Sequence, residues 1–313
     1  MQQLLSIVAR EEERQNARGV SLDSPRQTFS LWQCREQRVS LDTPRIMGIL
    51  NVTPDSFSDG GCFTDVGRAV AHAQAMVEAG ADILDIGGES TRPGAQAVDE
   101  AEELRRVLPV IQELTKTLTV PISIDTRHAT VARQAIEAGA CIVNDVAPFS
   151  GDKAMAAVVR EAGAGLVLTH TRGTPQDMTE KASYADVVAT VEANLRQALA
   201  FAREEGIARE ACVIDPGLGF AKDTEQNLQL LGALKRLKRL APVLIGASRK
   251  RFIGEICNVP EASKRLGGSL CVAVWSVLQG AAIVRVHDVR ETKECLAMAM
   301  ALKHACLSEN RAC

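Results

Sequence analysis

The apolar run Ile46-Met47-Gly48-Ile49-Leu50 stops at the polar residue Asn51, and this pattern decides the fold because it recurs along the chain. Seven further short runs, apolar and rich in β-branched residues, each lead into a polar residue that could do chemistry. They occupy residues 82–84, 121–124, 141–143, 165–168, 212–214, 242–245 and 283–284. Stretches rich in Ala, Glu and Arg separate the runs. Strands that alternate with helices in this way predict an α/β protein with a closed (β/α)8 TIM barrel.

The segments between the runs have the periodicity of helices. Residues 65–79 place Val66, Ala69 and Val70 on one face, and Gly80 follows the segment. Residues 99–116 and 130–138 show similar stripes. Apolar stripes of this kind pack a helix against a sheet, so we expect them to contribute to the core and assign no other role to them.

Length suggests one domain with an N-terminal extension. The chain has 313 residues, whereas a barrel takes roughly 250. We therefore expect a variable tail over residues 1–27 and a single barrel domain over residues 28–313. Residues 29–32 and 38–41 look like two short strands around a polar turn, and they predict a hairpin that closes the bottom of the barrel.

Composition excludes several classes of protein. The net charge is −3 and 46% of the residues are hydrophobic. We therefore expect a large core and no nucleic-acid or anionic-membrane partner. No stretch is long and uncharged enough to span a bilayer. The chain has nine Cys and no C-x-x-C pair, which favours buried thiols in a reducing cytoplasm over disulfides or a metal site.

Polar residues at the ends of the runs are the candidates for function, because barrels place their sites at the carboxyl ends of the strands. Two long Gly-rich loops, residues 51–61 and 87–94, follow the first two runs and are expected on the same rim. Arg285 and His287 are two residues apart, so both point the same way and predict an anion site. We expect an ion pair at a helix start for Arg249, and helix caps for Asp145 and Asp288.

Several long motifs occur in a fixed order and together resemble the dihydropteroate synthase family, which includes the targets of sulfonamides. The resemblance covers about residue 30 to the C-terminus. Its motifs are residues 47–61, 85–94, 123–126, 143–145, 215–217, 219–220, 248–250 and 285–288. The first two motifs are long and unusual, so the match is specific.

The resemblance implies an enzyme that joins a dihydropterin diphosphate to 4-aminobenzoate and releases diphosphate. It implies that the pterin substrate contacts Thr91, Asp125, Asn144, Asp215, Lys250, Arg285 and His287. It implies that 4-aminobenzoate is framed by Phe57, Thr91, Arg92, Pro93, Phe220 and Arg251. Asn51 would meet a Mg²⁺ ion carried by the diphosphate, which fits the few protein ligands that this ion takes. The residues that would take part in catalysis are Asn51, Asp125, Lys250, Arg285 and His287.

The chemistry of these residue types agrees with the implied roles. A pterin ring presents adjacent N–H donors, and a carboxylate such as Asp215 can accept two parallel hydrogen bonds from them. Asn144 offers both a donor and an acceptor to the mixed ring nitrogens. Lys250 can donate to the pterin carbonyl; a Schiff-base role is the rival, but no neighbouring residue implies a carbonyl substrate.

The chain departs from the family pattern at two places, and the oligomeric state is an expectation from the family. Arg251 stands where many members have Ser, and Thr169-His170-Thr171 stands where the family usually has Met-His-Met. Members are commonly homodimers, and the apolar stretch 270–278 is the candidate contact.

Two alternatives stay open at this point. One is the pterin-binding domain of a corrinoid methyltransferase system, which shares the barrel and the Asp/Asn clamp but does not need the anion site of Arg285 and His287. The other is an inactive barrel that serves only as a scaffold for a partner. Loss of Asp125, Asp215 or Lys250 would favour the scaffold, and all three residues are present.

Overall fold

The expected N-terminal tail, residues 1–27, lies outside the part of the chain that can be described, as do several loop segments. The computed structural model describes residues 29–52, 62–89, 98–147, 154–173, 177–178 and 180–309.

An eight-stranded parallel sheet forms the centre of the molecule, in the order β8-β7-β6-β5-β4-β3-β10-β9. Its strands are β3 (Arg45–Asn51), β4 (Ile83–Gly87), β5 (Ile122–Asp125), β6 (Ile142–Asp145), β7 (Gly165–Thr169), β8 (Cys212–Asp215), β9 (Leu244–Ile245) and β10 (Ile283–Val286). A parallel bridge between Ile214 and Val243 joins the two edges of the sheet. The predicted barrel and all eight of its strands are therefore confirmed.

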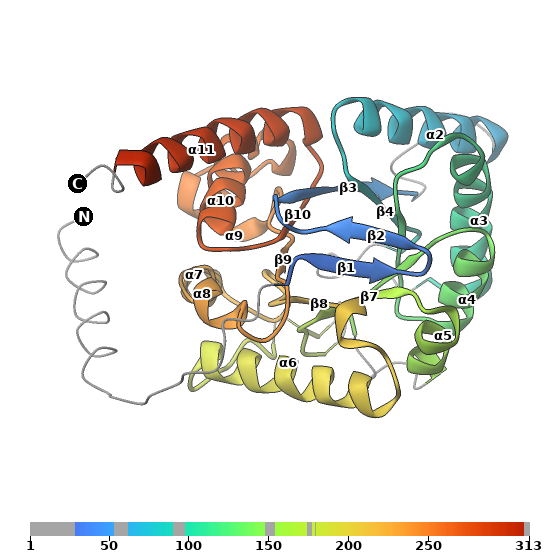
Figure 1. Ribbon diagram of the computed structural model, residues 1–313, viewed down its shortest axis with the longest axis horizontal. Coiled ribbons are helices and arrows are strands. Elements are labelled where there is room, and N and C mark those ends of the chain that lie inside the picture. The colour runs from blue at the N-terminus through green and yellow to red at the C-terminus, as the bar shows by residue number, and fades with distance from the viewer. Residues whose placement is uncertain are drawn as a thin grey trace.

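Helices surround the barrel (Figure 1). They are α2 (Cys62–Glu78), α3 (Glu100–Thr117), α4 (Ala129–Glu137), α5 (Ala154–Ala162), α6 (Val187–Glu204), α7 (Thr224–Gly232), α8 (Leu234–Leu237), α9 (Arg251–Cys257), α10 (Leu266–Leu278) and α11 (Val289–Glu309), with short 3-10 turns η2 (Arg209–Ala211) and η3 (Ala262–Lys264). The three segments with predicted helical stripes match α2, α3 and α4 to within a few residues. Their buried faces pack on the outer side of the strands in one continuous core.

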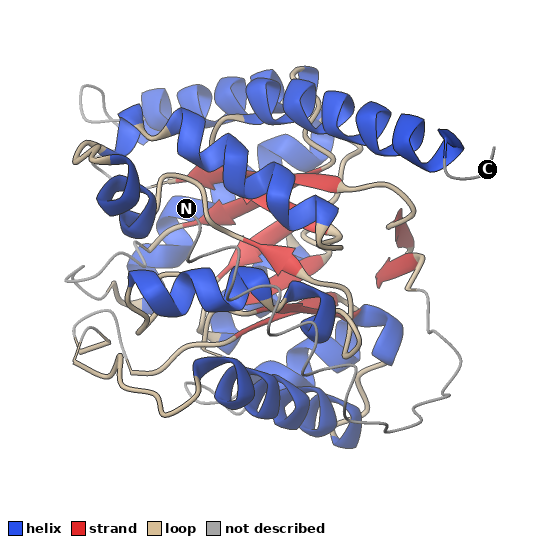
Figure 2. Cartoon of the chain, turned by 90° about the vertical axis from the view of Figure 1, so that its left-hand side faces the viewer, coloured by secondary structure: helices blue, strands red, loops and turns tan. Residues whose placement is uncertain are grey.

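The predicted hairpin is also present, as β1 (Leu31–Cys34) paired with β2 (Gln37–Ser40). It lies across the middle of the ring of helices in Figure 1 and at one end of the strands in Figure 2. Trp32 is fully buried, and its indole N–H donates to the carbonyl of Ala211 at 2.8 Å, just before β8 begins. The Arg35 N–H donates to the carbonyl of Gly163, just before β7. The hairpin therefore covers the amino-terminal ends of the strands.

The inside of the barrel changes from apolar to polar along the strands. The side chains that pack against the hairpin form one layer: Met47, Ile83, Ile142, Val167, Val213, Leu244 and Ile283. Two residues further along the same strands stand Asp85, Asn144, Thr169, Asp215 and Arg285. Because the side-chain period of a strand is two, these residues face the same interior. The polar layer therefore lies towards the carboxyl ends, away from the hairpin.

None of the helices within the described residues is long and apolar enough to cross a membrane.

Candidate active site

Strand register brings four backbone positions to one level at the carboxyl end of the barrel. Asn51 pairs with Gly87, Gly87 pairs with Asp125, and Asp125 pairs with Asn144. The sequence separates these residues by up to 93 positions, which is the interval from Asn51 to Asn144. The parallel register makes them neighbours, and so three of the predicted site residues share one side of the barrel mouth.

Arg285 lies between two carboxylates. Its Nε donates to Asp85 Oδ2 at 2.5 Å and its Nη2 donates to Asp125 Oδ2 at 2.6 Å. Asp85 is fully buried, and the side chain of Arg285 is 18% exposed. Charge-assisted hydrogen bonds of this length are strong, and they hold the guanidinium in a defined orientation below the barrel mouth.

Asn144 completes this cluster, because its Nδ2 donates to Asp85 Oδ2 at 3.1 Å. Burial raises the pKa of the Asp125 carboxyl to about 7; Asp85 adds to the rise and Arg285 opposes it. Neither Asp85 Oδ1 nor Asp125 Oδ1 has a hydrogen-bond partner among the described residues, although both are buried. Buried oxygens without donors are uncommon, and they mark this cluster as a place that can accept hydrogen bonds from a ligand.

Asp215, Lys250 and Phe220 form a second group on the opposite side, from β8 and from the segment after β9. Asp215 Oδ1 accepts from the Gly217 N–H at 2.7 Å. The ammonium of Lys250 lies 4.1 Å from the centre of the Phe220 ring and donates to the carbonyl of Leu218. Burial raises the pKa of Asp215, and Lys250 opposes this shift. Burial lowers the pKa of Lys250 to about 8, and Asp215 opposes that shift in turn.

The two groups meet at Gly246, which stands two residues beyond Leu244 of the apolar layer. A Cβ built on Gly246 would lie 3.6 Å from Asp215 Oδ2 and 3.8 Å from Arg285 Cδ. A larger residue would fill the interior between these side chains. The glycine therefore leaves Asp215 and Arg285 as neighbours.

The remaining predicted residues near the last strands have separate partners. His287 Nδ1 lies 3.0 Å from Ser248 Oγ. Arg249 Nε donates to Asp288 Oδ2 at 3.1 Å, so the predicted ion pair at this helix start is confirmed. The Arg251 side chain is 63% exposed and pairs with Glu255 at 3.1 Å along α9. Of these three, His287 is nearest in sequence to the buried Arg285, and Arg251 faces solvent.

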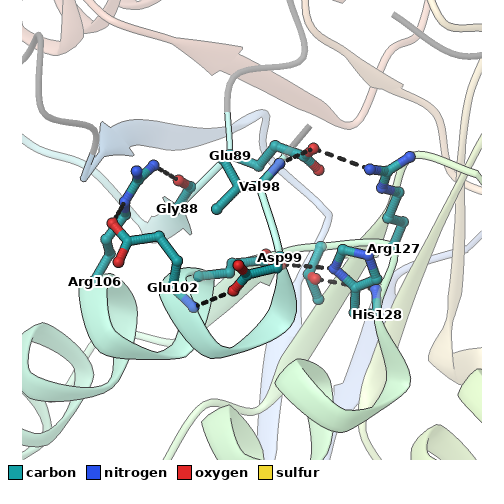
Figure 3. A network of polar contacts seen from close by, with 10 residues as sticks. Gly88, Glu89, Val98, Asp99, Glu102, Arg106, Arg127 and His128 are labelled. Carbon is teal, nitrogen blue, oxygen red and sulfur yellow. Dashed lines mark hydrogen bonds and ion pairs between the residues drawn. The ribbon is translucent and has the colours of Figure 1, made fainter. Parts of the chain in front are cut away.

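Another polar network holds the two ends of the segment 90–97, as Figure 3 shows. Glu89 Oε1 accepts from the Val98 N–H at 3.1 Å and from Arg127 Nη2 at 3.0 Å. Next to it, His128 Nδ1 lies 2.8 Å from Oε2 of the buried Glu103. Glu89 thus fixes the points where the chain leaves β4 and returns to α3.

Four predicted contacts of 4-aminobenzoate lie outside the described residues: Phe57, Thr91, Arg92 and Pro93. Their two loops begin at the ends of β3 and β4, beside Asn51 and Gly87. The described residues that the structure brings together at the barrel mouth are Asn51, Asp125, Asn144, Asp215, Phe220, Lys250 and Arg285.

Asp85 was not among the predicted site residues, although it ends the second apolar run. Its position in the strand could have indicated a role, because Asp85 faces the barrel interior and its neighbours on that face of the strand are not polar. Lys222 and His170 were also not predicted as site residues. Lys222 stands two residues after the motif at 219–220, but nothing in the sequence shows that it is buried.

The described residues hold no group of three or more His, Cys, Asp or Glu side chains that could bind a metal ion. Asn51 could nevertheless bind an ion that takes most of its ligands from diphosphate and water. Asn51 Oδ1 and Asp125 Oδ2 lie 3.9 and 3.8 Å from the point where a Gly87 Cβ would stand. The glycine therefore leaves space beside Asn51 Oδ1, a neutral oxygen of the kind that Mg²⁺ accepts as a ligand, whereas Asp125 Oδ2 already accepts from Arg285.

Comparison with known proteins agrees with this geometry. Residues 47–287 match the family of pterin binding enzymes. A dihydropteroate synthase from Synechocystis sp. is 46% identical over 258 residues, which cover 82% of this chain and 89% of the relative. Similar solved structures include a dihydropteroate synthase from Xanthomonas albilineans with 4-aminobenzoic acid (44% identity, TM-score 0.83, 88% of this chain and 99% of that chain). The enzyme from the same organism with 7,8-dihydropteroate has 41% identity and a TM-score of 0.80, with 87% and 98% covered. The chain belongs to the dihydropteroate synthase family of pterin-binding enzymes.

Proposed function

We propose that the chain condenses (7,8-dihydropterin-6-yl)methyl diphosphate with 4-aminobenzoate to give 7,8-dihydropteroate and diphosphate, a step of folate biosynthesis. The observation that carries this proposal is the polar layer at the carboxyl end of the barrel. It places acceptors from Asp125 and Asp215, an amide from Asn144 and a donor from Lys250 around one interior space. The corrinoid alternative has no specific observation in its favour, since the similar relatives and structures named above are all dihydropteroate synthases.

The pterin ring binds between the two groups of the site. Asp215 accepts from the adjacent N–H donors of the ring, and Lys250 donates to its carbonyl side. Asp125 and Asn144 hold the other edge, with Asp85 and Arg285 fixing their orientation. Buried charged groups stabilise a bound ring only when each charge has a partner. Here Arg285 is paired with Asp85 and Asp125, and Lys250 is near Asp215.

The reaction proceeds by early departure of diphosphate. The electron-rich dihydropterin stabilises positive charge on its exocyclic methylene as the C–O bond to diphosphate breaks. The arylamine nitrogen then forms the new C–N bond, and its extra proton passes to water or to the released diphosphate. The amine is largely unprotonated at neutral pH, so the site needs no strong general base. The carboxylates around Arg285 stabilise the positive charge on the ring, and His287 and Arg285 stabilise the negative charge on the departing diphosphate.

Mg²⁺ is proposed as the cofactor, with Asn51 as its protein ligand. The ion would supply charge neutralisation of the diphosphate when bound. Asn51 itself offers a neutral oxygen, which leaves most of the coordination sphere to diphosphate and water. Gly87 keeps the space beside this oxygen open.

We propose that 4-aminobenzoate packs against Phe220, with Lys250 above the ring of that residue. Phe57, Thr91, Arg92 and Pro93 are proposed to frame it from the two loops. For Arg251 we propose a contact through the backbone N–H at the start of α9, because the side chain faces solvent beside Glu255. Sulfonamides copy the flat ring and anionic end of the substrate, and we expect them to compete with it.

A homodimer is the proposed assembly. Trp275 and Leu278 on α10 and Met298 and Leu302 on α11 are large apolar side chains that are 39–63% exposed. The two helices pack on each other on the outer side of the barrel (Figure 2). An exposed apolar surface of this kind is typical of a subunit interface. The described cysteines are free thiols, which supports a cytoplasmic location.

Diphosphate release tests the proposed function. We expect release only when the dihydropterin diphosphate, 4-aminobenzoate and Mg²⁺ are all present, and loss of activity after addition of a chelator. Release without 4-aminobenzoate at the same rate would show a hydrolase and would contradict the proposal.

Two variants test the pterin clamp. Asp215→Asn and Lys250→Ala each remove a charge-assisted bond worth about 1.5–3 kcal/mol, so pterin affinity falls by roughly one to two decades. Calorimetric titration of the folded variants measures this loss, and Lys235→Ala on the exposed face of α8 is the matched control. Unchanged affinity would remove these residues from the clamp.

His287 tests the leaving-group side of the site. We expect His287→Ala to slow diphosphate release more than it weakens binding of a pterin that lacks the diphosphate. The same loss of affinity for the pterin alcohol and for the diphosphate would contradict its assignment.

A further inference from the structure

The ammonium of Lys222 is buried beside the proposed substrate site, and no carboxylate of the described residues forms an ion pair with it. Lys222 is 4% exposed and stands before α7. Its Nζ donates to the carbonyls of Gly217 and Phe220, both at 2.9 Å. It also lies 3.0 Å from His170 Nδ1 and 3.4 Å from the His170 carbonyl. The three nearest acceptors match the three N–H donors of one ammonium group.

His170 can accept this hydrogen bond because its ring is neutral. Burial, and then the charge of Lys222, lower the pKa of His170 to about 3. A neutral imidazole that accepts at Nδ1 carries its proton on Nε2, which lies 3.2 Å from the Nδ2 position of Asn194 on α6. Because the N and O of an amide are assigned from their partners, this tautomer assigns Oδ1 of Asn194 to that position, where it accepts from Nε2. Burial also lowers the pKa of Lys222 to about 7, while the surrounding acceptors favour its charged form. A chain of polar contacts therefore runs from α6 through His170 to Lys222.

These contacts fix the segment 217–220, which carries a wall of the site. Asn227 Oδ1 on α7 accepts from the Gly219 N–H at 2.8 Å, and Lys250 donates to the Leu218 carbonyl. With the two bonds from Lys222, the carbonyls of Gly217, Leu218 and Phe220 and the N–H of Gly219 each have a side-chain partner. The backbone is held in an unusual shape, with positive φ at Gly217, Gly219 and Ala221.

We propose that Lys222, supported by His170, is a positioning residue for the second substrate: it sets the backbone that carries Phe220 and the carbonyl that receives Lys250. The inference rests on the proposed function, because it assigns the Phe220 wall to 4-aminobenzoate. Lys222 touches neither substrate. It acts through Phe220, whose ring lies 4.1 Å from the Lys250 ammonium.

Lys222→Met tests the proposal, because it keeps the length of the side chain and removes every donor. We expect the KM for 4-aminobenzoate to rise by about tenfold or more, since small displacements of a positioning group have effects of this size. The kcat should change by less than about threefold, because the leaving-group residues Arg285 and His287 lie on and directly after β10, away from the segment 217–220. Lys235→Met on α8 makes the same chemical change on an exposed helix and should leave both constants unchanged.

His170 gives a second test that does not depend on the folding of Lys222→Met. His170→Asn keeps an acceptor near the position of Nδ1, whereas His170→Ala removes it. We expect the KM for 4-aminobenzoate to rise in His170→Ala and to return towards the wild-type value in His170→Asn.

The possible outcomes distinguish the positioning role of Lys222 from the proposed function. An active wild type with an unchanged KM in Lys222→Met, or with equal KM values in the two His170 variants, overturns this inference and leaves the proposed function intact. A lower melting temperature with an unchanged KM has the same meaning, because it shows a structural role only. A wild type that binds no pterin overturns the proposed function and this inference with it.

Discussion

Replacement of Asp85 by Asn probes the centre of the site, because one oxygen of Asp85 receives hydrogen bonds from two residues. Oδ2 accepts from Arg285 at 2.5 Å and from Asn144 at 3.1 Å, whereas Oδ1 is buried and has no partner among the described residues. An Asn side chain can leave its oxygen in the place of Oδ2. Its NH₂ group then occupies the place of Oδ1, where it finds no acceptor.

Two effects set the size of the change, and both are destabilising. An unsatisfied buried donor costs about 1–3 kcal/mol, and the ion pair with Arg285 becomes a hydrogen bond from a cation to a neutral amide oxygen, which is weaker by about 1 kcal/mol. Arg285 keeps its ion pair with Asp125, so it does not become an unpaired charge. We therefore expect the free energy of unfolding to fall by roughly 2–4 kcal/mol, which leaves a typical domain folded.

The same substitution should change the titration of Asp125. Asp85 raises the pKa of Asp125, although burial is the larger cause. Loss of the Asp85 charge lowers this pKa, so Asp125 stays ionised to a lower pH. Pterin affinity is expected to fall at acid pH as Asp125 gains a proton, and we call this fall the acid limb. In Asp85→Asn the acid limb should move to lower pH.

Denaturant unfolding measures the first effect, and calorimetric titration of pterin across a pH series measures the second. Asp288→Asn is the matched control, because it removes a carboxylate that pairs with Arg249 away from Asp125. It should leave the acid limb in place. An Asp85→Asn variant as stable as the wild type, with an unmoved acid limb, would refute the account of this cluster.

Three further outcomes are expected. Pterin affinity in the wild type should fall below pH 7, as Asp125 with its raised pKa gains a proton, and above pH 8, as Lys250 with its lowered pKa loses one. Calorimetry on Asp125→Asn should show a smaller loss of affinity on the acid side, and the remaining loss comes from Asp215, whose pKa is also raised by burial. Trp32→Ala should lower the free energy of unfolding by about 3–5 kcal/mol in guanidinium titrations, because it empties a fully buried site under the barrel. Ala221→Gly should raise it by about 1 kcal/mol, because Ala221 has a φ of 48° that glycine adopts without strain; a destabilised variant would contradict this.

The barrel and its order of strands could be predicted from the sequence because their signals are local. Each apolar run, such as residues 46–50, is long enough to identify a strand, and the Ala-rich segments between runs identify the helices. The carboxyl ends of parallel strands must share one rim, so the position of Asn51, Asp125, Asn144 and Asp215 on that rim followed without a structure.

Partners across the barrel could not be predicted, because they depend on the register of strands that are far apart in the chain. Asp85 and Arg285 are 200 residues apart, and only their common inward face brings them together. From the sequence, Arg285 was expected to point with His287 towards an anion; the structure places its guanidinium between Asp85 and Asp125 and places His287 beside Ser248.

Burial is a second property that required the three-dimensional arrangement. The order of apolar runs and helical segments was enough to predict a parallel barrel with a polar rim and the residue types on that rim. It did not distinguish Lys222, which is 4% exposed among backbone carbonyls, from the lysines on the helix surfaces, nor Arg251, which faces solvent, from Lys250 beside it. Periodicity along one strand or helix reports which face a residue occupies, whereas the charges and carbonyls that meet it come from other segments of the chain.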